Sequence, residues 1–230
     1  MLSVQYIFNV PKQNSRHYTF NFEEEDMQLL LPKRNHYPDW TKLDTHKCEH
    51  CPLTNNESDT CPLAEGLLKP VSDFNSLSSI DEISVEVVTK ERRVVKTTTA
   101  QKALSSLMGL IIPTSGCPHT RFFRPMARFH LPFASEEETL FRAAATYLLS
   151  QYFSSQKGQA FDHELTGLKE VYQDIHIVNH HIAERLRLAC KEDSSVNALV
   201  ILDLFTKSMP AVIDESLDEL KYIFEPMLPK

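Results

Sequence analysis

The chain has 230 residues, of which 42% are apolar and 24% charged, and its formal net charge is −7. This composition is ordinary for a globular protein and excludes a low-complexity chain. The negative charge argues against a nucleic-acid partner, because a phosphate backbone requires a positive surface.

The N-terminal segment and the hydropathy pattern predict a cytoplasmic chain without a membrane span. MLSVQYIFNVPKQN lacks the basic start and the long apolar run of a secretory signal peptide. No stretch of about 18 uncharged apolar residues occurs. The nearest is the helical stretch 196–205, which Asp203 interrupts.

The first half of the chain reads as two β-hairpins separated by a long irregular stretch. Residues 3–10 and 17–24 alternate apolar and polar positions around a turn, and residues 82–89 and 92–98 form a second such pair. Between them, residues 32–79 hold five prolines, many small polar residues and three cysteines, with little periodic structure. Such a stretch needs something other than a core to order it.

The second half has the periodicity of helices. Thr98 and Gln101 have the spacing of a capping box before an apolar helix that Pro113 should stop. Ser135 and Glu138 form a second capping box, before a helix that we expect to end near residue 153.

Two further helical segments are predicted after residue 160. A helix over 162–191 carries an apolar stripe at steps of three and four. The stretch 195–223 reads as a core helix that is broken near Pro210 and followed by an amphipathic one.

Together these elements predict an α+β fold. A small antiparallel sheet from the N-terminal half, with its cysteine-rich loop, would pack on a C-terminal bundle of four to five helices. The β-rich region spans residues 1–98, with a metal-binding loop at about 44–64, and the helical region spans 99–230. No linker divides them, so we expect one continuous domain.

Four cysteines have the pattern of a metal centre. Cys48 and Cys51 form a C-x2-C knuckle, in which two thiolates can reach one ion from a tight turn, and Cys61 follows after nine intervening residues. Cys117, in a loop after a helix, is the best candidate for the fourth ligand. The reserves are His46, His50 and His119.

A structural zinc ion is the metal that we expect first at these cysteines, because it suits a C-x2-C knuckle. An iron–sulfur cluster such as [4Fe-4S] is the alternative metal centre, since Cys51, Cys61 and Cys117 each precede proline, an arrangement also seen among its ligands. The alternative is that these are ordinary small apolar cysteines, as we expect for Cys190. Coordination could order a loop that has few apolar side chains.

Basic residues are concentrated in one segment. Residues 92–135 contain seven lysines and arginines and no acidic residue, which leaves 17 basic against 31 acidic residues elsewhere. Four residues within this segment could bind an anionic small molecule, namely Arg121, Arg124, Arg128 and His119. Guanidinium groups suit phosphate and carboxylate oxygens. The alternative is internal pairing with acidic side chains, including those of residues 23–26.

A catalytic site is less well supported than a binding site. Cys117 and His119 could form a nucleophile and its base, with an arginine holding an anionic substrate. The chain contains no Walker loop, no G-x-G-x-x-G and no G-x-S-x-G motif, and its five glycines offer little material for a phosphate cradle. The sequence therefore favours a protein that is not an enzyme.

Three segments carry a resemblance to a known family: CEHCPL, CPLAEGLL and the run ALSSLMGLIIPTSGCPHTRFFRPMARFHLPFASEEETLFRAA. They are similar to an uncharacterised family of bacterial, mainly proteobacterial, proteins of unknown function. The resemblance implies a bacterial cytoplasmic setting and brings no activity or site residues.

The leading hypothesis is a metal-binding accessory or regulatory protein in which the cysteine site ties the sheet region to the helical half and other surfaces contact a protein partner. The second hypothesis is an enzyme or ligand sensor that uses Cys117, His119 and the three arginines on an anionic small molecule.

Overall fold

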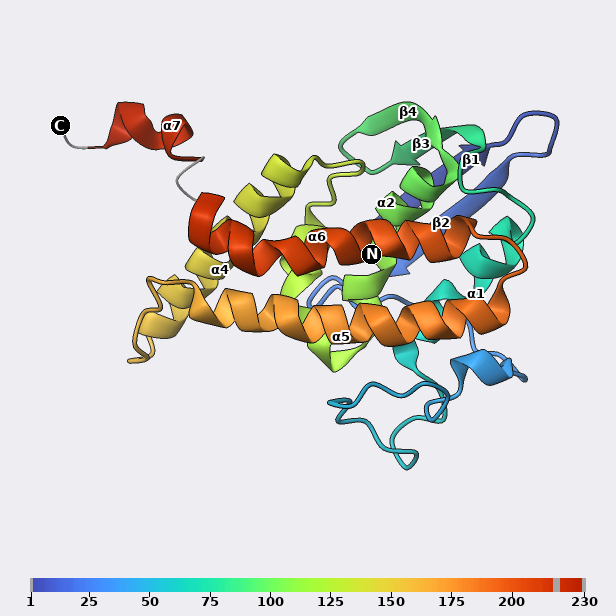
Figure 1. The fold of residues 1–230 in the computed structure, drawn as a ribbon, viewed down its shortest axis with the longest axis horizontal. Helices are drawn as coiled ribbons and strands as arrows, with labels where there is room; N and C mark the ends of the chain where they lie inside the picture. Colours follow the sequence, from blue (N-terminus) through green and yellow to red (C-terminus); the bar gives the residue numbers. More distant parts are fainter. Residues whose placement is uncertain (1, 217–219, 229–230) are drawn as a thin grey trace.

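The computed structural model describes residues 2–216 and 220–228 (Figure 1). Its elements follow in chain order: β1 Leu2–Asn9, β2 Arg16–Phe22, η1 Asp39–Thr41, α1 Pro62–Phe74, β3 Glu82–Val88, β4 Arg93–Thr99, α2 Ala100–Thr114, η2 Pro118–Phe123, α3 Arg124–Arg128, α4 Glu136–Ser155, α5 Thr166–Ala189, α6 Ser194–Ser216, α7 Lys221–Phe224 and η4 Glu225–Met227. The predicted α+β class is confirmed.

The two predicted hairpins are confirmed and join into one antiparallel sheet of order β2-β1-β3-β4. β1 lies inside the sheet, where Tyr6 pairs with Tyr18 of β2 and with Val87 of β3. Alternate residues of β1, β2 and β3 are buried, as expected for a sheet with one face on a core. β4 is an edge strand with mostly exposed or half-buried side chains.

Helix α1 corrects the expectation that residues 32–79 lack regular structure. It begins at Pro62, where a missing N–H has no cost because the first helical N–H groups are unbonded anyway. It continues through Pro70, one of the five prolines on which the expectation of irregular structure rested. Leu63, Leu67 and Phe74 are fully buried on one side, so packing outweighs the lost hydrogen bond.

The helices of the second half follow the prediction with local differences. The Ser135–Glu138 capping box is confirmed, with both reciprocal hydrogen bonds present. The capping box predicted from Thr98 and Gln101 is wrong, because β4 extends to Thr99, which becomes the residue before α2 and makes no side-chain cap bond. Pro113 does not stop α2, which ends one residue later at Thr114.

Helices α5 and α6 run side by side and antiparallel along the molecule (Figure 1). The predicted break near Pro210 is wrong, since α6 continues through it to Ser216. Met209 and Ile213 are buried on either side of Pro210, and their packing holds the helical path. The amphipathic helix predicted next falls partly on residues 217–219, which lie outside the described residues.

The main core takes side chains from both regions. Val4, Phe8 and Val85 of the sheet belong to the same buried cluster as Leu107 of α2 and Ile182 of α5. A second cluster lies between α4, α5 and the end of α6. Because α2 contacts the sheet, α1 and α6, it joins the two parts of the chain.

One described helix is long and apolar enough to cross a membrane by length and composition, namely the segment Ser194–Ile213 of α6. A helix buried in a protein core meets the same two criteria. In the structure α6 packs along α2 and α5. The absence of a membrane span stays a prediction.

A buried histidine joins the sheet to the segment after α3 and predicts an acid-sensitive fold. The Nε2 atom of His130 lies 2.6 Å from the hydroxyl of Tyr6. Burial, and then the charge of Arg142, lowers the pKa of His130 to about 3. This pKa is below the unfolded value, so the stabilisation is complete above about pH 6.5 and is lost as the pH falls towards 3.

We expect His130→Gln to flatten the pH dependence of unfolding. The wild-type free energy of unfolding should fall between pH 6.5 and 4 by up to about 1.4 kcal/mol per pH unit more than that of the variant. Urea denaturation at several pH values measures the difference. Parallel curves for the two proteins would show that His130 does not titrate on unfolding.

Candidate metal centre

The four cysteines come from three separate segments that the fold brings together. Cys48 and Cys51 lie in a tight turn, where the N–H of Cys51 donates to the carbonyl of Cys48 at 3.0 Å. Cys61 precedes the first residue of α1, and Cys117 precedes the first residue of η2. All four are partly buried, and none forms a disulfide.

The pKa of Cys48 depends on the charges of the other three cysteines. Burial raises the pKa of Cys48 to about 12, and the charges of Cys61, Cys117 and Cys51 act in the same direction. The charge of Arg185 acts in the opposite direction. Cys117, the predicted fourth ligand, is therefore near enough to Cys48 for the two charges to interact.

Backbone N–H groups support the sulfur of Cys117. Burial raises the pKa of this thiol to about 11, whereas hydrogen bonds from the backbone of His119 and Thr120 lower it. N–H donors of this kind stabilise a thiolate and are common hydrogen-bond partners of metal-bound sulfur. The turn that follows Cys117 thus directs two N–H groups at its sulfur.

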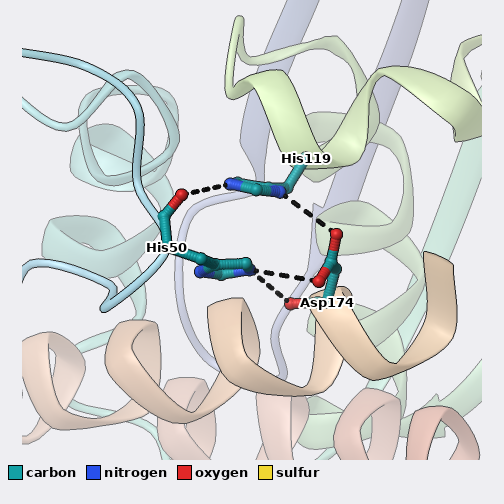
Figure 2. Close-up of side chains that lie close together, drawn as sticks. All are labelled: His50, His119 and Asp174. Atoms are coloured by element: carbon teal, nitrogen blue, oxygen red, sulfur yellow. Dashed lines mark hydrogen bonds and ion pairs between the residues drawn. The ribbon is translucent and has the colours of Figure 1, made fainter. Parts of the chain in front are cut away.

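Two histidines from the cysteine segments meet on α5 (Figure 2). The rings of His50 and His119 stack with their centroids 3.8 Å apart. His119 Nε2 lies 3.0 Å from the carbonyl of His50, and His50 Nε2 lies 3.2 Å from the carbonyl of Asp174. Since a carbonyl only accepts, both Nε2 atoms carry the proton.

The carboxylate of Asp174 completes this group. Its Oδ2 lies 3.5 Å from His119 Nδ1, and its Oδ1 lies 3.8 Å from His50 Nε2. The ligand atoms of the three residues lie within 4.8 Å of one another, which would suit a metal ion. However, both Nε2 atoms already donate to carbonyls, so the group is better described as a clamp that holds the Cys48–Cys51 turn and the Cys117 turn on α5.

A buried arginine anchors the start of the cysteine loop, which lies beneath α5 on the side away from α6 (Figure 1). Arg185 of α5 is only 2% exposed. It donates hydrogen bonds to the carbonyls of Trp40, Lys42 and Leu43 at 2.9, 2.7 and 2.9 Å. Asp174 and Arg185 are eleven residues apart, about three turns, so one face of α5 carries both attachments.

The arginine segment does not form a single site. Arg124 is 8% exposed and turns inwards to Asp26 Oδ2 at 2.7 Å and to Gln28 Oε1 at 2.5 Å. Arg128 donates to the carbonyl of Glu24 at 3.2 Å. Arg121 is exposed, and His119 belongs to the clamp. Arg124 is therefore paired internally with the acidic segment 23–26, which was the alternative to an anion site.

We expect Arg124→Gln to destabilise the fold by about 2–3 kcal/mol, because it removes charge-assisted hydrogen bonds of a buried group. Arg121→Gln, on the exposed neighbour, is the matched control and should change the free energy of unfolding by less than about 0.5 kcal/mol. Urea denaturation measures both. Equal stability of the two variants would show that the Arg124 contacts contribute nothing.

Sequence reasoning missed the residues of α5 that hold the centre. Asp174 and Arg185 are polar positions beside the apolar stripe of a long helix, and no local motif marks either of them. The one available signal was that α5 is unusually rich in histidine and arginine. Only the docking of the loop reveals which of these side chains it uses.

The fold defines the class: an α+β chain in which a four-stranded antiparallel sheet shares a core with the helices of the second half. The chain matches the family described as "Domain of unknown function (DUF6901)" over residues 4–225, and it belongs to that family. No curated protein and no solved structure matches it.

Proposed function

We propose that the chain is a metal-binding regulatory protein in which Cys48, Cys51, Cys61 and Cys117 hold one metal centre. The observation that carries this proposal is the meeting of four thiols from three segments, with backbone N–H groups directed at one of the sulfurs. Four thiolates complete the ligand set of a closed zinc site or of an iron–sulfur cluster.

An iron–sulfur cluster is the metal centre that we favour. Four sulfurs about 2.3 Å from one zinc ion would lie roughly 3.8 Å apart. Among the described residues, the group whose ligand atoms all lie within 4.8 Å is His50, His119 and Asp174, and the thiols do not form so tight a group. A four-iron cluster takes one thiolate on each iron, which suits a wider spacing. The three Cys-Pro pairs agree with it.

The regulatory part of the proposal follows from how the loop is ordered. Residues 44–59 are mostly exposed or half-buried, so few apolar contacts hold them. Coordination free energy would then contribute much of their order. Loss or oxidation of the centre would free this loop from α5 and change the surface offered to a protein partner.

A catalytic Cys117 is less well supported by the same geometry. An activated cysteine needs a lowered pKa and a base at hydrogen-bond distance. Burial raises the pKa of Cys117, and the His119 ring is engaged by Asp174 and by the carbonyl of His50. The side chain of His119 is thus committed to the clamp.

Metal analysis of the purified chain tests the proposal. After anaerobic purification we expect about four iron atoms and four sulfide ions per chain, with a brown colour and absorbance at roughly 400 nm. One zinc ion per colourless chain would keep the four-thiolate centre and correct the metal. Absence of both metals, even after reconstitution with iron and sulfide or with zinc, would reject the proposal.

Limited proteolysis tests the regulatory part. Cleavage between residues 42 and 60 should be rapid in the metal-free chain and slow in the loaded chain, while the sheet and α2 resist in both. Equal cleavage of the two forms would show that the centre does not control the loop.

A further inference from the structure

A cleft in the helical half is separate from the cysteine centre. It has a volume of about 520 Å³ and is bounded by the end of the sheet, α2, the segment after α3, α4, α5 and α6. This is the size range of small-molecule sites. Apolar side chains such as Ile112, Phe123 and Leu202 form much of its wall.

Among the described residues, the charges that line this cleft are all positive. The wall includes Lys96, Lys102 and Arg142, and no described aspartate or glutamate contributes to it. This is unusual in a chain of net charge −7. Low-dielectric walls that carry charge of one sign concentrate the opposite charge. The cleft therefore complements an anion.

Arg142 is the most buried of the three cations that line the cleft. It is half-buried on α4, and its Nη2 atom donates to the backbone carbonyls of Met126 and Phe129. Within the described part of the chain no carboxylate forms an ion pair with it. Glu138, one turn earlier, uses its carboxylate to cap α4 at Ser135. Burial lowers the pKa of Arg142, which reflects the cost of a partly desolvated charge.

From this lining we infer that the cleft binds an amphipathic anion, with its apolar body between α2 and α5 and its carboxylate or phosphate head at Arg142. Lys96 and Lys102 are exposed at the rim and attract the head. Arg142 provides a planar fork, which suits either kind of head group. This inference does not rest on the metal centre.

Gly109 offers a way to fill the cleft without disturbing the fold. It lies on α2 in the cleft wall, and a Cβ atom added there would meet no atom within 4 Å. Glycine inside a helix is unfavourable compared with other residues. Gly109→Leu should therefore fold and occupy the space of the ligand. Ala145→Leu adds similar bulk on the exposed side of α4 and is the matched control.

Calorimetric titration with decanoate, decyl phosphate and decanol, each below its micelle concentration, tests the inference. We expect micromolar binding of at least one anion and at least tenfold weaker binding of decanol. The tighter anion identifies the head group. Equal affinity for the alcohol, or no binding of any probe, would overturn the inference.

The variants locate the ligand. Gly109→Leu should abolish binding, whereas Ala145→Leu should leave it unchanged. Arg142→Gln, whose amide can still donate to a carbonyl, should weaken anion binding at least tenfold and leave decanol binding unchanged. If Arg142→Gln fails to fold, the double variant Lys96→Gln/Lys102→Gln replaces it, with a smaller loss expected for the anions alone. Unchanged binding to Gly109→Leu would place the ligand elsewhere and reject the site.

Discussion

Arg185→Met should destabilise the chain by about 3–5 kcal/mol, because the substitution removes a buried guanidinium group and leaves three backbone carbonyls without their donor. Arg185 is among the largest fully buried side chains and donates to the carbonyls of Trp40, Lys42 and Leu43. Methionine fills a similar volume but has no N–H. The segment that leads into the cysteine loop would then lose its attachment to α5.

The same substitution should weaken metal retention. The positive charge of Arg185 opposes the rise in the pKa of Cys48, so it favours the thiolate that a metal needs. Arg185→Lys keeps a charge but cannot reproduce the geometry of a guanidinium fork. We expect the lysine variant to fall between wild type and Arg185→Met in both stability and metal content.

Arg187→Met is the control for this prediction. Arg187 lies two residues further along α5, is exposed, and pairs with Glu184 on the same helix. Its loss should change the free energy of unfolding by less than about 0.5 kcal/mol. Urea denaturation and metal analysis of the three variants provide the comparison. If the free energies of unfolding of Arg185→Met and Arg187→Met differ by less than about 1 kcal/mol, the hydrogen bonds of Arg185 do not contribute importantly to stability.

Cys117→Ser should remove the metal and lower the stability of the loaded protein by roughly 3 kcal/mol or more, because coordination free energy is part of the folding free energy. In metal-free protein the same substitution should cost only about 1 kcal/mol. The difference between the two values isolates the contribution of the metal from that of packing around the side chain.

Cys190→Ser is the matched control for the cysteine prediction. Cys190 follows the last residue of α5. Burial raises the pKa of its thiol and a hydrogen bond with Ser195 lowers it, and none of the other four cysteines contributes to the shift. This variant should keep the full metal content and the wild-type spectrum. If Cys117→Ser retains as much metal as Cys190→Ser, residue 117 is not a ligand.

The local elements of this protein could be predicted from sequence because local forces fix them. Alternation around two turns predicted both hairpins, and the spacing of Ser135 and Glu138 predicted the start of α4. Failures occurred where packing overrode a local rule. Pro70 and Pro210 lie inside helices α1 and α6, since neighbouring buried side chains maintain a helical path despite a missing N–H.

The candidate site could be predicted only in part. The C-x2-C knuckle and the Cys-Pro pairs predict Cys48, Cys51, Cys61 and Cys117 as one ligand set, because two thiols in a tight turn are typical of a metal site. The arginine segment gave no such answer. No local pattern distinguishes one basic residue of this segment from another. The sequence could therefore not reveal that Arg124 turns inwards to Asp26, which lies 98 positions earlier.

The sequence by itself determined the hairpins and the helical half, since each depends on neighbours within a few residues. Tertiary structure alone decided that Asp174 and Arg185 contact the cysteine loop, and that Arg142 lines a cleft whose described residues include no aspartate or glutamate. These features depend on which faces of α5 and α4 meet distant segments. That meeting is set by the burial of apolar side chains across the whole core, which no local pattern records.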